Sequence, residues 1–161
     1  MSVGIALGSN LGESEKILTL SIEELKKIHQ GTDDTFRVSS FYKTAPVDCP
    51  PESPFFLNAV LELETKLLPH ALLYFLRTLE KKSGRSFPYA YHAPRTLDLD
   101  LLYYDSITIF TPELELPHPR IRERSFVLKP LVEINPHLIL PGWELSTQAY
   151  LKILEKNNSH E

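Results

Sequence analysis

Residues 56–84 read FLNAVLELETKLLPHALLYFLRTLEKKSG, and this stretch decides the fold because its hydrophobic period changes halfway along. Over residues 56–65 apolar and polar side chains alternate, which predicts a strand with one polar face. From Pro69 the apolar residues recur at three- and four-residue steps, which predicts an amphipathic helix that stops near Gly84. A strand followed directly by such a helix predicts the first two elements of a βαβ unit.

The flanking segments complete a repeated order of elements. Upstream, residues 3–7 predict a buried strand, residues 12–31 have helical periodicity, and residues 36–42 alternate as a second strand. Downstream, residues 97–104 predict another strand, with a partner strand at residues 107–110. The order strand, helix, strand, strand, helix, strand predicts an α+β fold with a ferredoxin-like βαββαβ core.

The chain beyond this core predicts extra C-terminal strands and helices. Residues 122–132 predict a short helix, residues 136–141 an extended segment, and residues 146–154 a closing helix. No internal repeat, low-complexity tract or linker rich in Gly or Ser divides the sequence. We therefore expect residues 1–161 to form a single domain.

Composition excludes several classes of protein. The 161 residues are 42% hydrophobic and 24% charged, the profile of a globular domain rather than a disordered or membrane-spanning chain. The formal net charge is −4, so we expect neither nucleic acid nor a membrane as a partner. Cys49 is the single cysteine, and the start has no basic segment followed by a long apolar one, so the expected compartment is the cytoplasm.

The segment 94–102, PRTLDLDLL, carries the most informative chemistry. Asp98 and Asp100 are two residues apart on a predicted strand, so their carboxylates point to one face with Cβ atoms roughly 7 Å apart. Carboxylate oxygens suit Mg²⁺, which completes its coordination with waters and with phosphate oxygens. The alternative interpretation places both aspartates on the solvent-facing side of an ordinary amphipathic strand.

Basic residues near this strand favour an anionic ligand. Arg95 directly precedes the acidic strand, and a guanidinium group binds phosphate oxygens two at a time. For Arg120, Arg122 and Lys129 a solvated surface role is the better interpretation. His118 lies between two prolines, so a rigid loop presents an imidazole suited to phosphate binding or to proton transfer.

Two residues of the strand at 56–65 suggest recognition of a flat ring. Phe56 and Asn58 share one face, and an aromatic ring beside an amide can stack on a heterocycle and read its edge. A core phenylalanine with a hydrogen-bonded asparagine is an equally good interpretation. The cluster at residues 8–10 lets a ligand approach the backbone, but it lacks the spacing of a P-loop.

Short motifs stand in order along most of the chain: GSN at 8–10, SSFYKT at 39–44, FLN at 56–58, GR at 84–85, PRTLDLD at 94–100, LPHPR at 116–120 and RSFVL at 124–128. Together they resemble the 6-hydroxymethyl-7,8-dihydropterin pyrophosphokinase family of folate biosynthesis. The motifs around Asp98 and His118 are the most specific. The resemblance implies a ferredoxin-like core and transfer of pyrophosphate from ATP to the dihydropterin, with AMP as the second product.

The resemblance also implies a role for individual residues. Asp98 and Asp100 would hold two Mg²⁺ ions with ATP, and Arg85 and Arg95 would complete the catalytic set. The implied ATP-binding residues are Glu80, Arg85, Arg95, Leu101, His118 and Arg124. The implied pterin-binding residues are Gly8, Thr44, Ala45, Val47, Phe56, Asn58, His92, Asp98 and Phe126. The expected partners are ATP and 6-hydroxymethyl-7,8-dihydropterin, bound by a monomer.

One loop departs from the family pattern. The difference lies between Gly84 and Pro94. Members of the family carry two arginines and a tryptophan at the positions of Phe87, Tyr91 and His92, so the sequence does not decide how tightly this loop closes and excludes water. A non-catalytic domain that binds ATP or pterin is therefore one alternative. A different Mg²⁺-dependent phosphotransferase would keep the aspartates but not the aromatic and asparagine residues of the pterin set. An RNA-binding module would need a basic strand with exposed aromatic residues, which the sequence lacks.

Overall fold

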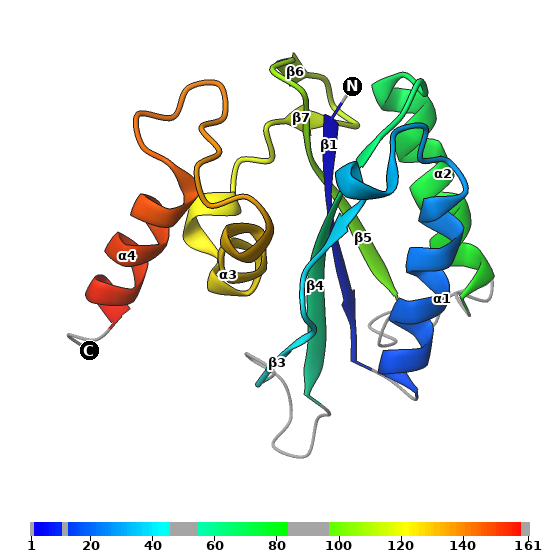
Figure 1. Cartoon of the computed structure of the whole chain (residues 1–161), viewed down its shortest axis with the longest axis horizontal. Coiled ribbons are helices and arrows are strands. Elements are labelled where there is room, and N and C mark those ends of the chain that lie inside the picture. The colour runs from blue at the N-terminus through cyan, green and yellow to red at the C-terminus, as the bar shows by residue number, and fades with distance from the viewer. Residues whose placement is uncertain (1, 11–12, 46–54, 84–96, 159–161) are drawn as a thin grey trace.

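The computed structural model describes residues 2–10, 13–45, 55–83 and 97–158 (Figure 1). Their elements are, in order, β1 (Ser2–Ser9), α1 (Ser14–Lys26), the 3₁₀ helix η1 (Asp33–Thr35), β2 (Arg37–Val38), β3 (Tyr42–Thr44), β4 (Phe56–Glu64), α2 (Pro69–Lys82), β5 (Asp98–Tyr104), β6 (Ile109–Phe110), β7 (Glu115–Leu116), the 3₁₀ helix η2 (Ile121–Glu123), α3 (Ser125–Ile134) and α4 (Thr147–Asn158). The predicted α+β order of the core is confirmed. None of the described helices is long and apolar enough to cross a membrane.

One antiparallel sheet organises the molecule. The strands β2, β4, β1 and β5 lie side by side in this order, and β3 pairs with β4 as well. Each crossover through α1 or α2 therefore skips one strand position, which is the split βαβ arrangement predicted from the sequence.

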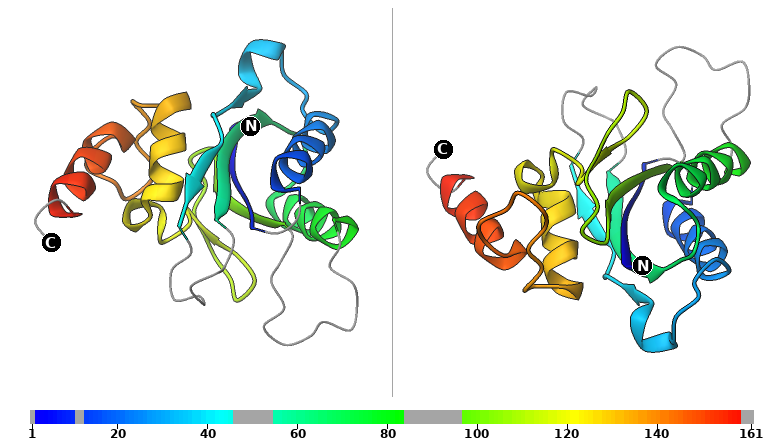
Figure 2. Two further views of the ribbon diagram at one scale, coloured as in Figure 1. Left: turned by 90° about the horizontal axis from the view of Figure 1, so that it is seen from below. Right: turned by 90° about the horizontal axis from the view of Figure 1, so that it is seen from above.

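Helices cover the two faces of this sheet. The helices α1 and α2 cover one face, α3 covers the other, and α4 packs on the outer side of α3 (Figure 2). Under α1 and α2, side chains such as Leu18, Leu72 and Leu76 are fully buried against Val3 and Ile5 of β1. Full burial of one such side chain stabilises the fold by about 1.5–3 kcal/mol. This closed core holds the strands in place and so also positions the residues on the opposite face of the sheet.

The predicted strand at 36–42 is wrong in one respect, because a β-bulge divides it into β2 and β3. Val38 pairs with Leu61 and Tyr42 pairs with Asn58, so three residues of this strand lie opposite two residues of β4. At the bulge, the hydroxyl of Ser39 accepts a hydrogen bond from the backbone N–H of Val60 at 3.0 Å. A side-chain oxygen therefore replaces a backbone acceptor, and the strand continues one residue out of register.

Two further expectations need correction. The segment at 107–110 does not pair with β5; its last two residues form β6, which pairs with β7 in a separate two-stranded sheet. The polar face predicted for β4 is confirmed, and it packs toward α3, where Asn58 and Glu62 are only 7% and 1% exposed. The C-terminal helices lie close to their predicted positions, as α3 and α4, whereas residues 136–137 form a turn inside the segment predicted to be extended.

Candidate active site

Asp98 and Asp100 stand at the start of β5 on the face that α3 covers. They lie opposite Gly8 and Ala6 of β1, whereas Leu99 between them is buried in the core on the other face. Both aspartates are half-buried and line the same cavity of about 820 Å³. The predicted placement of two carboxylates on one face is confirmed.

The larger cavity lies between the sheet and the first turn of α3. Its wall contains Ala6, Leu7, Gly8, Thr44, Ala45, Phe56, Asn58, Asp98, Asp100, Arg120, Arg124, Ser125, Phe126 and Val127. Gly8, Thr44, Ala45, Phe56, Asn58, Asp98 and Phe126 of the predicted pterin set are thus brought together from four strands and one helix. The remaining two residues of that set, Val47 and His92, lie outside the described residues.

The floor of this cavity combines an amide with open backbone. The Nδ2 of Asn58 donates a hydrogen bond to Oγ1 of Thr44 at 2.8 Å. A Cβ atom on Gly8 would lie 3.2 Å from Oδ1 of Asn58, so the absence of a side chain keeps this oxygen accessible. Phe126 is 39% exposed, and the guanidinium of Arg124 lies 5.7 Å from its ring centre. An aromatic wall over a polar edge suits a flat heterocycle.

A smaller cavity of about 350 Å³ adjoins the larger one. Its wall contains Leu73, Arg77, Asp100, Leu101, Glu113, Leu114, Glu115, His118, Pro119, Arg120 and Arg124. Leu101, His118 and Arg124 of the predicted ATP set therefore lie together here. Asp100, Arg120 and Arg124 line both cavities, so the cavities meet at one carboxylate and two guanidinium groups.

His118 enters the smaller cavity as a hydrogen-bonding group. Burial lowers its pKa, and the positive charges of Arg124 and Arg120 also lower it, against an opposing effect of Asp100. The neutral ring is therefore favoured. Its Nδ1 accepts a hydrogen bond from the backbone N–H of Arg120 at 3.2 Å, so Nε2 carries the ring hydrogen. A neutral imidazole of this tautomer donates to an anionic oxygen without adding a charge.

Glu80 supports the cavity wall from behind. It is 1% exposed, and its carboxylate accepts hydrogen bonds from Arg77 and from the backbone N–H of Leu99, each at 2.9 Å. Arg77 also donates to the carbonyl oxygen of Leu99 at 2.9 Å. This pair therefore fixes the start of β5 relative to α2, beside the two aspartates. The predicted residues Arg85 and Arg95 lie outside the described residues.

Sequence reasoning missed two arginines of the site. Arg77 lines the smaller cavity, and its signal was its position three residues before Glu80 on one helical face. Arg120 is exposed, as expected, but it also lines both cavities, which was not expected. Its signal was its place two residues after the proline-flanked His118, whose Nδ1 accepts a hydrogen bond from the backbone N–H of Arg120.

The site is thus two joined cavities with different chemistry. One offers an aromatic wall and an amide edge, and the other offers arginines and a neutral histidine suited to phosphate oxygens. The carboxylate of Asp100 lies at their junction, with Asp98 beside it in the larger cavity. On this fold, such a site is suited to the chemistry of the enzymes that transfer phosphate groups to a small molecule.

Residues 4–136 match the family described as 7,8-dihydro-6-hydroxymethylpterin-pyrophosphokinase (HPPK), and the chain belongs to this family. It is 42% identical over 130 residues to the 2-amino-4-hydroxy-6-hydroxymethyldihydropteridine pyrophosphokinase of Bacillus subtilis, a match that covers 81% of this chain and 75% of that protein. The family predicted from the sequence motifs is confirmed.

Longer proteins are also similar to this chain. It is 36% identical over 151 residues to the folic acid synthesis protein fol1 of Pneumocystis carinii, which covers 94% of this chain. The chain spans only 20% to 26% of the length of the longer curated relatives that it matches. The crystal structure of Plasmodium falciparum HPPK-DHPS superimposes with a TM-score of 0.77 at 12% identity, covering 99% of this chain and 42% of that one, so the two share a fold.

Proposed function

We propose that this chain transfers pyrophosphate from ATP to 6-hydroxymethyl-7,8-dihydropterin, giving AMP and the dihydropterin diphosphate. The observation that carries the proposal is the junction of the two cavities at Asp100, Arg120 and Arg124. A nucleotide in the smaller cavity and a pterin in the larger one would meet there. Holding two reactants in contact replaces an encounter in solution and can supply much of the rate enhancement.

The larger cavity fits the pterin. The ring would lie between Phe56 and Phe126, with its edge read by Asn58 and by the backbone of Thr44 and Ala45. A site with buried polar groups such as Asn58 rejects analogues that leave these groups unpaired. We assign Gly8 to the cavity floor and include Val47 and His92 in the pterin set on the basis of the sequence motifs.

The smaller cavity fits the ATP phosphates. Arg124 and the neutral ring of His118 would donate hydrogen bonds to phosphate oxygens, and Leu101 would contribute an apolar wall. We include Glu80 as a residue that supports this wall, and Arg85 and Arg95 as further phosphate ligands. Transfer to the hydroxyl of the pterin needs positioning and charge stabilisation, so a covalent protein nucleophile is not required.

Asp98 and Asp100 fit a hard divalent cation. Within the described residues no group of three His, Cys, Asp or Glu side chains gathers as a complete metal site. Two half-buried carboxylates on one face, next to a space for phosphates, match Mg²⁺, which takes its other ligands from water and substrate. We propose that these two aspartates hold two Mg²⁺ ions with ATP; bound there, the ions would neutralise charge on the phosphates.

The proposal also covers the state of the protein. We propose that residues 1–161 act as one pyrophosphokinase domain, as a monomer in the cytoplasm. The continuous sheet and the absence of a Gly- or Ser-rich linker in the sequence support a single domain. Net charge and cysteine content support the compartment.

The test is ³¹P NMR of the protein with Mg²⁺-ATP, with and without 6-hydroxymethyl-7,8-dihydropterin. We expect AMP and a new diphosphate ester that appear together and only with the pterin. A 6-methyl analogue, which lacks the hydroxyl group that accepts the pyrophosphate, should give no AMP.

Other products would identify the alternatives. Formation of ADP would indicate a different phosphotransferase. Binding of both ligands without turnover would indicate a non-catalytic domain in which the altered loop at Phe87, Tyr91 and His92 has cost the enzyme its activity.

A further inference from the structure

The helix α3 forms a wall of the larger cavity through its first turn alone. Ser125, Phe126 and Val127 line the cavity, and the rest of the helix extends across the sheet (Figure 2). Glu133 follows Phe126 by seven residues, so both side chains leave the same side of the helix, about 10 Å apart along its axis. A contact that holds Glu133 therefore also constrains the face that carries Phe126.

The carboxylate of Glu133 is held by three donors from one segment. Its Oε2 accepts hydrogen bonds from the backbone N–H of Ser40 at 2.8 Å and from the Ser40 hydroxyl at 3.0 Å. Its Oε1 accepts a hydrogen bond from the hydroxyl of Tyr42 at 2.6 Å. We call Ser40, Tyr42 and Glu133 the α3 clamp. These residues join the bulge and β3 directly to the last turns of α3.

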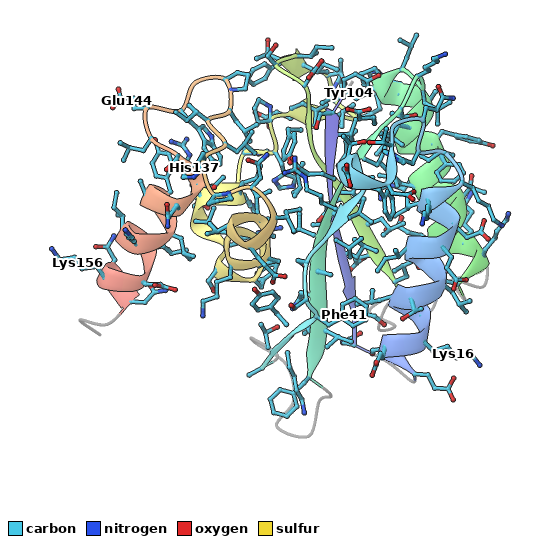
Figure 3. The ribbon with its side chains drawn as sticks, in the orientation of Figure 1. Lys16, Phe41, Tyr104, His137, Glu144 and Lys156 are labelled. Atoms are coloured by element: carbon cyan, nitrogen blue, oxygen red, sulfur yellow. The ribbon has the colours of Figure 1, made fainter. Side chains whose placement is uncertain are left out.

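The strand β3 supplies the opposite wall of the same cavity. Tyr42 pairs with Asn58 across the sheet, and Thr44, two residues further along, accepts the hydrogen bond of Asn58. Phe41 points into the core beneath α1 and α2 (Figure 3), so the alternation of the strand turns Tyr42 toward α3. Because β3 has three residues and, among the described strands, pairs only with β4, the α3 clamp is a second support for this edge.

We propose that Tyr42 and Glu133 are positioning residues, which set the distance between Phe126 on α3 and the polar edge formed by Thr44 and Asn58. The inference rests on the proposed function, because the ring held at this distance is the pterin. Stacking depends steeply on separation: a gap widened by 0.5–1 Å loses about a quarter to a half of the dispersion energy. A small displacement of α3 would therefore weaken pterin binding.

A second contact at the same end of α3 provides a matched control. Tyr103 donates a hydrogen bond to Oε2 of Glu62, and Asn135, just after the last residue of α3, donates to the same oxygen at 2.9 Å. Arg37 lies 3.0 Å from Oε1 of Glu62. This contact also pairs a tyrosine with a carboxylate, but Glu62 is 1% exposed and pairs with Gly4, at the end of β1 away from the cavity. It holds α3 to the sheet without contacting β3.

The experiment compares Tyr42→Phe, Glu133→Gln, the double variant and Tyr103→Phe. Glu133 is exposed, so the clamp variants should fold, which urea denaturation checks. We measure the Kd for 6-hydroxymethyl-7,8-dihydropterin by titration calorimetry and the KM for ATP. Each single clamp variant should raise the pterin Kd about five- to tenfold, and the double variant little further, because both single variants weaken the hydrogen bond between Tyr42 and Glu133. The KM for ATP should stay within about twofold.

The outcomes separate the inference from the function on which it rests. Tyr103→Phe should lower the urea midpoint without changing the pterin Kd. A pterin Kd that is unchanged in both clamp variants would overturn the inference, and so would an equal rise in Tyr103→Phe, since this would reflect general loosening of α3. If the wild-type protein does not bind the pterin, the proposed function itself fails. The wild-type protein is therefore measured before any variant.

Discussion

The two faces of the central sheet differ although the same strands build them. Toward α1 and α2, β1 and β5 present side chains such as Ile5, Leu7 and Leu99, which are at most 2% exposed. Toward α3, the same strands present glycines and the aspartates of the candidate site, around the larger cavity. Because neighbouring residues of a strand point to opposite faces, one face of the sheet stabilises the fold and the other, which we call the ligand face, carries the candidate site.

The difference shows how the molecule can bury polar groups. A buried amide or carboxylate costs free energy unless hydrogen bonds replace its lost hydration. On the α3 face, Asn58 and Glu62 have such partners in Thr44, Tyr103 and Asn135. The closed apolar face contributes the burial that offsets the remaining cost, so the site does not have to stabilise the fold.

The largest effect should come from Asp100, on the ligand face. We expect Asp100→Asn to lower the rate of AMP formation by about 10²-fold or more, because the neutral amide removes the charge at the junction of the cavities. Asp98→Asn should behave alike. The rate is measured by AMP release under saturating substrates, and a rate near that of the wild type in either variant would remove the proposed metal role.

The neighbour on the other face is the control for this prediction. Leu99 is fully buried, so Leu99→Ala should lower the free energy of unfolding by about 2–5 kcal/mol. The kcat of the folded fraction should stay near that of the wild type. Asp105→Asn, in the turn after β5, should change neither quantity, since asparagine tolerates the positive φ of 53° at this position.

Two glycines of β1, both on the ligand face, allow a test with smaller expected effects that separates stability from pterin binding. A Cβ atom on Gly4 would overlap the ring of Tyr103, so Gly4→Ala should destabilise the fold by about 1–3 kcal/mol and leave pterin affinity unchanged. A Cβ atom on Gly8 would instead enter the larger cavity beside Asn58. Gly8→Ala should therefore raise the pterin Kd about tenfold with little loss of stability.

Urea denaturation and pterin titration measure the two quantities for both glycine variants. If Gly8→Ala bound the pterin as well as the wild type, the ring would not lie over β1, and the assignment of the larger cavity would be wrong. A stable Gly4→Ala would show that Tyr103 can move, and would weaken its use as a control for the α3 clamp.

The sequence predicted those parts of the fold that depend on local periodicity. The strands around residues 3–7 and 97–104 and the helix from Pro69 are marked by the spacing of their own apolar residues. Strand pairing depends on two segments at once, so the sequence carries no local signal for it, and the predicted pairing of residues 107–110 with the strand at 97–104 was wrong. The bulge beside Ser39 was missed because its cause, a hydroxyl in the place of a backbone acceptor, depends on the register with β4.

The candidate site divides in the same way. Asp98 with Asp100, and Phe56 with Asn58, were predicted from spacing along a single strand, because side chains two residues apart share a face. Arg77 and Arg120 lie on different elements and reach the smaller cavity only through the packing of α2 and of the segment after β7. No local pattern brings these two arginines together.

The smallest expected effect concerns His118, a titratable group of the smaller cavity. Because burial lowers the pKa of His118 below its ordinary value of 6.5, the unfolded chain takes up a proton at higher pH than the folded one does. The contribution of this histidine to stability is thus complete above pH 6.5 and is lost as the pH falls through its lowered pKa. His118→Asn cannot titrate, and its amide oxygen can still accept from the backbone N–H of Arg120.

The measurement is the free energy of unfolding in urea for both proteins at about pH 7.5 and about pH 5.5, on either side of the ordinary histidine pKa. All other titrating groups are shared, so they cancel in the difference between wild type and variant. We expect the advantage of the wild type to shrink at the lower pH. An equal difference at both values would show that the ring is not held in its neutral form, and the donor role of Nε2 toward phosphate would then have to be replaced by that of a charged imidazolium.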